Sequence, residues 1–293
     1  MAGHITYKRK IFMRRTVPAL FVVVLAVAIP KLAAAQQFMP RSAVLGMSDS
    51  APALNVVIGH GTEPAPLPEA VVLPRMAPEL ALQVMANHAI IQGARLGSYS
   101  AISTVTANLP DLSERGQFEL DRRYIAPKTL QFTPVRFTGD GFVKSNVIIR
   151  LLQSEVDQVQ KDQPAQTAID NQNYKFSYKG REVLRGRAVH VFHVKPRKKR
   201  PGLFKGRIFV DAYTGTLVRA EGRMVKSPSI FIKDINFVQD YTDVGDFTFP
   251  LHMHSQARAR VIGRVIVDVV HRDYHPITAS EVAASAGGVA GSK

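Results

Sequence analysis

Two stretches of the chain repeat apolar residues at spacings of three and four, the period of a helix with one buried face. The first covers 78–92 and begins at Pro78, a residue that the first helical turn tolerates. The second covers 142–160, and Asp140 precedes it as a suitable N-cap. Its apolar stripe consists of Val143, Val147, Ile148, Leu151, Leu152, Val156 and Val159. We therefore predict two helices.

From Gly97 onward, outside the second helix, apolar and polar residues alternate, which is the period of a half-buried strand. Gly, Asp and Pro turns separate the strands, and the links between them are short. The predicted strands are 99–107, 118–124, 130–132, 173–179, 187–195, 205–211, 216–226, 230–241, 248–261 and 265–275. The pattern predicts an α+β fold: a single, strongly curved antiparallel sheet of about ten strands, with helices to cover one face.

The turn between the second and third strands places one arginine on an apolar face. Pairing Tyr124 with Lys128 sets Arg122 opposite Leu130 and makes the apolar sides of the two strands coincide. Arg122 is then a charged residue on an otherwise apolar surface.

The N-terminal 35 residues have the layout of a cleavable signal peptide. Basic residues precede an apolar run from Val17 to Ile29, and the small residues 33–35 follow. The run has about 13 residues against roughly 20 for a membrane span, so cleavage after Ala35 is favoured over anchoring. General secretion is favoured over the twin-arginine route that Arg14 and Arg15 would allow. We expect a periplasmic protein.

The remaining chain divides by composition. Residues 36–75 are rich in Pro, Ala, Ser and Gly and predict a flexible leader. Residues 277–293 are Ala, Ser and Gly with almost no large apolar side chain, and predict a disordered tail. Residues 76–276 are enough for one domain with a full core.

Composition narrows the chemistry. The chain contains no cysteine, which excludes disulfides, thiolate metal sites and a cysteine nucleophile. Removing residues 1–35 lowers the net charge from +15 to +9, so an anionic partner is plausible, and after export that partner is lipid headgroup or cell-surface polymer rather than nucleic acid. No nucleophile elbow or phosphate loop is found, and we expect no cofactor and no enzymatic activity.

The histidines allow one enzymatic alternative, a metal-dependent hydrolase using His252, His254 and His271. A two-residue turn at 262–263 would set His254 opposite His271. A three-residue turn would align the apolar residues of both strands, pair Arg258 with Asp268 and separate those two histidines. Ordinary strand histidines are the favoured interpretation, and no metal site is expected.

A basic cluster lies between two predicted strands and forms a hairpin tip. It consists of Lys195, Arg197, Lys198, Lys199 and Arg200. A solvated loop is the usual role of such a cluster. The alternative is docking to an anionic membrane surface, where each basic residue contributes about 1 kcal/mol.

Several short motifs carry a family resemblance. They are the stretch 116–123 continuing to Pro127 and Phe132, the helix 142–160, the stretch 186–196, and the stretch 209–215 with Arg219 and Glu221. Together they resemble the outer-membrane lipoprotein carrier and sorting family (LolA-like), whose relatives include the LolB-like receptor and the RseB-like envelope-stress sensor. The resemblance covers about residues 78–275.

The resemblance implies an unclosed barrel whose concave face is covered by two helices, with a cavity for acyl chains of a lipid or an acylated protein. It also implies that Arg122 helps to hold the cavity closed. The lining candidates are Phe118, Leu120, Leu130, Phe132, Val147, Ile148, Leu151 and Leu152. A filled core is the equal alternative, and it would favour an RseB-like sensor or scaffold that binds protein partners.

Overall fold

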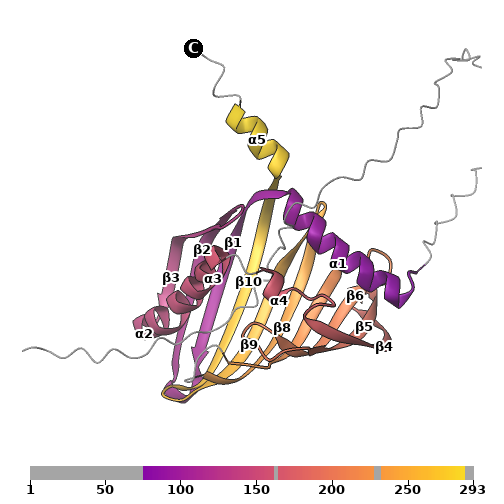
Figure 1. Ribbon diagram of the computed structural model, residues 1–293. Helices are drawn as coiled ribbons and strands as arrows, with labels where there is room; N and C mark the ends of the chain where they lie inside the picture. The colour runs from indigo at the N-terminus through magenta and orange to yellow at the C-terminus, as the bar shows by residue number, and fades with distance from the viewer. Residues whose placement is uncertain (1–74, 162–163, 228–231, 288–293) are drawn as a thin grey trace, which may run out of the picture.

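The computed structural model describes residues 75–161, 164–227 and 232–287 (Figure 1). The expected signal peptide and nearly all of the expected leader lie outside these residues. None of the helices in the described ranges is long and apolar enough to cross a membrane.

The order of the elements follows the prediction closely. The helices are α1 (Pro78–Arg95), η1 (Pro110–Leu112), α2 (Gly141–Val143), η2 (Lys144–Ile148), α3 (Ile149–Lys161), α4 (Pro164–Thr167) and α5 (Ala279–Gly287). The strands are β1 (Leu96–Leu109), β2 (Glu114–Ile125), β3 (Thr129–Gly139), β4 (Tyr174–Leu184), β5 (Arg187–Pro196), β6 (Phe204–Asp211), β7 (Leu217–Met224), β8 (Ile232–Val244), β9 (Phe247–Ala259) and β10 (Gly263–Thr278). The α+β prediction is confirmed.

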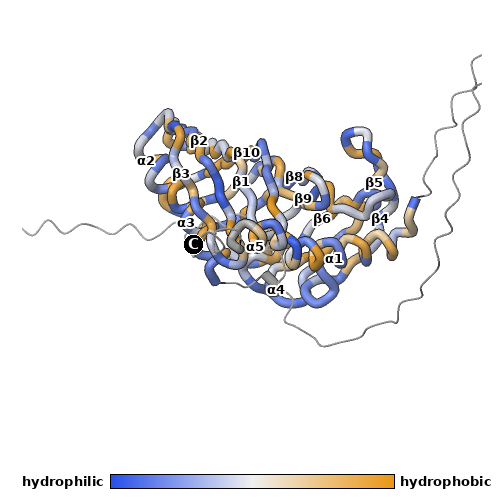
Figure 2. Tube along the Cα trace, turned by 90° about the horizontal axis from the view of Figure 1, so that it is seen from above, coloured by the Kyte–Doolittle hydropathy of each residue, from blue (hydrophilic) through white to orange (hydrophobic). Residues whose placement is uncertain are grey.

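All ten strands form one antiparallel sheet in the order β3-β2-β1-β10-β9-β8-β7-β6-β5-β4. The edge strands β3 and β4 do not pair, so the barrel stays open, as Figure 2 shows from above. The segment between these edge strands carries α2, η2, α3 and α4, which lie on the same side of the curved sheet as α1. We call this side the covered face and the other side the open face.

The core lies between the covered face and the helices. Val105, Val269 and Met253 are buried neighbours on three adjacent strands, and they point to the covered face. Ala81 of α1 and Leu151 of α3 belong to the same cluster of buried residues. The strand alternation and the two helical stripes therefore meet in one core.

The register between β2 and β3 differs from the predicted register by two residues. Tyr124 pairs with Leu130, so Arg122 lies opposite Phe132 rather than Leu130. A shift by two preserves which side chains share a face. Arg122 therefore keeps its predicted place on the covered face.

The second helix is longer and less regular than expected. It opens with the single turn α2, passes through the π-helical turn η2 and continues as α3. Asp140 is at the N-cap position but makes no cap hydrogen bond. Its Oδ2 instead accepts a hydrogen bond from Arg115 N at 2.9 Å, which joins the helix entrance to β2.

Helix α5 lies within the range 277–293, where the sequence predicted disorder. The sequence Thr278-Ala-Ser-Glu281 forms a capping box: Thr278 N donates to Glu281 Oε2 at 2.7 Å, and Glu281 N donates to Thr278 Oγ1 at 3.3 Å. This local signal is visible in the sequence, and the compositional argument overlooked it.

Candidate functional site

A buried ion pair joins the helical cover to the sheet. Arg122 Nη2 of β2 lies 2.6 Å from Glu155 Oε1 of α3, and only 8% and 7% of their side chains are exposed. Among the described residues, this is the only polar side-chain contact between α3 and the sheet. Helix α3 is otherwise held by apolar packing.

Local sequence explains why the two charges meet. Arg122 follows Phe118 and Leu120 at the strand period and shares their face. Glu155 follows Leu151 by four residues and Leu152 by three, so it lies on the buried stripe of α3. The sequence analysis identified Arg122 but overlooked Glu155, although a carboxylate within an apolar stripe is itself a signal.

Aromatic rings complete the surroundings of the arginine. Arg122 Nε donates a hydrogen bond to Tyr99 Oη at 2.9 Å, and its Cζ lies 5.3 Å from the centre of the Phe132 ring. Tyr99 also packs on Phe249 and Tyr274, which stack with their centroids 4.4 Å apart. The guanidinium therefore lies between the main core and a second, aromatic cluster.

The hydrogen bonding of Arg122 is incomplete. Its Nη1 is buried and has no hydrogen-bond partner among the described residues. Burial lowers the pKa of Arg122, but the Glu155 carboxylate together with Tyr99 and Tyr274 outweighs this effect, and the net pKa is raised well above the ordinary value. The charged form thus keeps a buried donor available for an acceptor that the described part of the chain does not supply.

His271, the third histidine of the metal hypothesis, lies next to this cluster. Its Nδ1 lies 2.9 Å from Ser103 Oγ on the covered face. Burial, reinforced by the positive charge of Arg122, lowers the pKa of His271 to about 3. The imidazole is therefore neutral at physiological pH.

The other two histidines of the metal hypothesis are on the open face. Gly263 pairs with Ala259, so His254 lies opposite Asp268, and His254 Nδ1 is 2.8 Å from its Oδ1. The predicted pairing of Arg258 with Asp268 is thus wrong by four residues, but the predicted separation of His254 from His271 is correct. Within the described ranges no three His, Asp or Glu residues are arranged to hold a metal ion.

The predicted lining residues, apart from Leu130, are brought together in the main core between the helical cover (η2 and α3) and the sheet. All are buried except Phe132, which is half-buried. Phe118, Leu120 and Leu151 belong to the main core, and Phe132 packs against it. Their role in ligand binding stays a prediction.

The predicted docking cluster divides into two parts. Lys195, Lys198 and Lys199 are exposed. Arg197 Nε donates to the carbonyl oxygens of residues 171 and 174, and Arg200 Nη2 donates to a side-chain oxygen of residue 173 at 2.6 Å. The two arginines therefore brace the loop before β4, and the three lysines are available to a partner.

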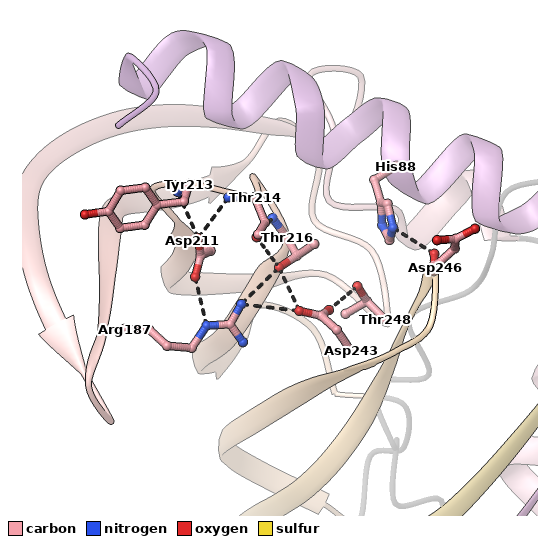
Figure 3. Close-up of polar contacts among 9 residues, drawn as sticks. All are labelled: His88, Arg187, Asp211, Tyr213, Thr214, Thr216, Asp243, Asp246 and Thr248. Carbon is pink, nitrogen blue, oxygen red and sulfur yellow. Dashed lines mark hydrogen bonds and ion pairs between the residues drawn. The ribbon is translucent and has the colours of Figure 1, made fainter. Parts of the chain in front are cut away.

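Arg187 and Asp211, which belong to the short sequence motifs, stabilise the turn between β6 and β7 (Figure 3). Arg187 Nε lies 2.8 Å from Asp211 Oδ2, and its Nη2 lies 3.3 Å from Asp243 Oδ2. Asp211 Oδ1 accepts hydrogen bonds from the backbone N–H groups of Tyr213 and Thr214. Burial raises the pKa of Asp211, but these bonds and Arg187 outweigh it, so the carboxyl has a lowered pKa.

Helix α1 is held by the β6–β7 turn and by the β8–β9 turn together with the start of β9. Gly215 has φ +71°, and a Cβ on it would lie 2.6 Å from Val84 of α1. Gln92 exchanges two hydrogen bonds with the backbone of Thr248, at 2.8 and 2.9 Å, and His88 Nε2 lies 3.0 Å from Asp246 O. Helix α1 is thus fixed by several polar contacts, unlike α3.

Comparisons with known proteins give fold similarity at low identity. No family model and no curated protein matches the sequence. The structure is similar to a putative outer-membrane lipoprotein-sorting protein domain from Vibrio parahaemolyticus (12% identity, 69% of this chain and 94% of that chain, TM-score 0.37). It is also similar to a DUF1329 family protein from Desulfovibrio piger (11%, 68% and 92%, TM-score 0.36) and a LolA superfamily protein from Nitrosomonas europaea (9%, 68% and 93%, TM-score 0.33).

At these identities and TM-scores the similarity is limited to the general fold and assigns no function to this chain.

Proposed function

We propose that this chain is a non-enzymatic, extracytoplasmic binding protein that holds acyl chains of a lipid or an acylated polypeptide between α3 and the sheet. In this role α3 is a movable cover, and the pair Arg122 and Glu155 closes it. The observation that carries the proposal is the buried ion pair, because it is the polar link of a cover that is otherwise attached by apolar packing.

A buried ion pair suits a closure that must open. Replacing such a pair by apolar residues of similar size is often neutral or stabilising, so the pair is a poor choice for stability alone. Opening would return both charges to water, which offsets part of the energy lost when they separate. The unpaired Nη1 of Arg122 could then donate to an ester or carboxyl oxygen at the polar end of the ligand.

Apolar burial would supply the affinity. Each methylene transferred from water to the site is worth about 0.8 kcal/mol, so a single acyl chain binds strongly once α3 has moved. The π-helical turn η2, immediately before α3, is a type of irregularity that is frequent at functional sites. It provides a place where the helix can change direction.

Native mass spectrometry of the protein, purified without detergent and followed by solvent extraction, tests the proposal. We expect stoichiometric lipid or lipopeptide on the wild-type protein. Phe132→Glu is expected to lose it, because a carboxylate would replace an apolar wall and pair with Arg122. Val135→Glu is the control on the same strand, because Val135 is 55% exposed, and it is expected to retain the ligand.

Two results would contradict the acyl-chain site. A folded Phe132→Glu protein with undiminished ligand would show that the lining residues are misassigned. A wild-type protein that carries no lipid and takes up none from added fatty acid would favour the filled core and an interaction module, whose protein partner crosslinking would recover.

A further inference from the structure

One end of the sheet gathers basic residues from many strands. It is the end formed by η1, by the β5–β6 and β9–β10 connections, by the end of β7 and by the starts of β4 and β8, and it lies away from α1 (Figure 1). We call it the basic end. It includes the exposed Lys195, Lys198 and Lys199 of the predicted docking cluster, but it extends far beyond that hairpin.

Strand register places like charges directly opposite one another at this end. Lys175 pairs with Lys195 across β4 and β5, and Lys205 pairs with Arg223 across β6 and β7. Val194 pairs with the residue after Lys205, so these two pairs continue in one row. Each of the four alternates with residues of the covered face, so all lie on the open face.

A second row of basic residues lies on the neighbouring strands of this end. Lys233 of β8 pairs with Arg258 of β9, which in turn pairs with Arg264 of β10. The two rows are offset, because Arg223 pairs with Asn236 of β8 and forms an ion pair with Asp234. Neighbouring strands are about 4.8 Å apart, so the basic side chains lie close together within each row. Like charges directly opposite each other destabilise a sheet. Among the described residues neither Lys233 nor Arg258 makes a salt bridge, so folding alone does not account for them.

Exposed apolar side chains project at the same end. Val261, in the β9–β10 connection, is 71% exposed, and Leu112 of η1 is 44% exposed. The two connections are joined, because Arg264 N donates to Asp111 Oδ2 at 2.9 Å. Phe142, 41% exposed, follows the end of β3 at this same end.

We propose that the basic end docks on an anionic lipid bilayer, with the two rows of Lys and Arg at the headgroups and the tips Leu112 and Val261 inserted among them. Basic residues near an anionic leaflet are attracted to it, and apolar side chains between them add burial that a purely charged partner would not offer. The apolar tips on adjacent connections are why a bilayer fits better than an acidic polypeptide. The proposal does not rest on the acyl-chain site.

Co-sedimentation with vesicles tests this surface. The probes are phosphatidylcholine vesicles with and without phosphatidylglycerol. The protein is used as it is purified from the producing cell, without further trimming of its N-terminus. We expect binding only to the anionic vesicles and weaker binding as salt rises. Lys233→Glu combined with Arg258→Glu is expected to weaken it by at least about tenfold. Val261→Asp is expected to weaken it by several-fold.

Matched controls are available away from the basic end. Arg123→Glu with Lys128→Glu makes the same charge change near the β2–β3 turn, and Ile91→Asp places a carboxylate on the exposed surface of α1. Both control variants are expected to bind as the wild type does. Three results would overturn the proposal. The wild type could fail to bind anionic vesicles, the controls could lose as much binding as the variants at the basic end, or poly-glutamate could bind at this end while vesicles do not. Circular dichroism verifies that each variant is folded.

Discussion

Replacing Glu155 by glutamine is expected to lower the free energy of unfolding by about 3–5 kcal/mol. The substitution keeps the size of the side chain but leaves the guanidinium of Arg122 buried without its counter-charge, 2.6 Å from the former carboxylate. Urea unfolding followed by circular dichroism measures the effect, with the midpoint falling while the slope is unchanged.

An exposed ion pair of the same chemistry is the control. Arg207 Nη2 is also 2.6 Å from Glu221 Oε1, but Arg207 is 48% exposed, so Glu221→Gln is expected to cost at most about 1 kcal/mol. The double replacement Arg122→Met with Glu155→Leu is expected to recover most of the stability, because no charge is then buried alone. Equal losses for Glu155→Gln and Glu221→Gln would mean that Glu155 is not the buried partner of Arg122.

Lowering the pH from 7 to 5 is expected to remove about 2 kcal/mol of folding stability through His271 alone. Its pKa is about 3 in the folded protein against an ordinary 6.5, so the unfolded chain binds a proton between these values that the folded chain does not. Stability therefore rises with pH across this window and is lost on acidification. Denaturant unfolding at a series of pH values measures it.

Two variants separate this effect from other titrating groups. His271→Asn keeps a polar atom near Ser103 Oγ but cannot take up a proton, so its stability is expected to depend less on pH below about 6. His275→Asn changes an exposed histidine on the same strand and is expected to follow the wild type. If His271→Asn showed the full wild-type loss, His271 would not be the responsible group.

The pH dependence and the closure of α3 involve the same cluster. Arg122 contributes to the lowered pKa of His271 and is also the residue that holds Glu155. A proton on His271 would add a second positive charge beside the guanidinium. Substitutions at Arg122 are therefore expected to change both the stability of the closed cover and its response to acid.

Local pattern was sufficient for the ten strands, for the two long helical segments and for which side of each strand is buried. Successive residues of a strand alternate between its two faces, so a register error of an even number of residues leaves every side chain on its correct face. The predicted register was wrong by two residues for β2–β3 and by four for β9–β10, yet Arg122 and the apolar residues stayed on the correct face. The helix stripe of α3 was equally secure, because its apolar spacing extends over several turns.

Pairing across long separations required the tertiary structure. The contact between Arg122 and Glu155 depends on where the segment between β3 and β4 crosses the sheet, and no local signal sets that position. The pairing of Lys205 with Arg223 and of Lys233 with Arg258 depends on the register of each strand pair, and a register shift of two residues would break it while every face stayed correct. The sequence by itself determined the strands, the two long helical segments and the buried faces through short-range periodicity. Only the tertiary structure decided which charges meet, because those contacts depend on the precise register and on packing between distant segments.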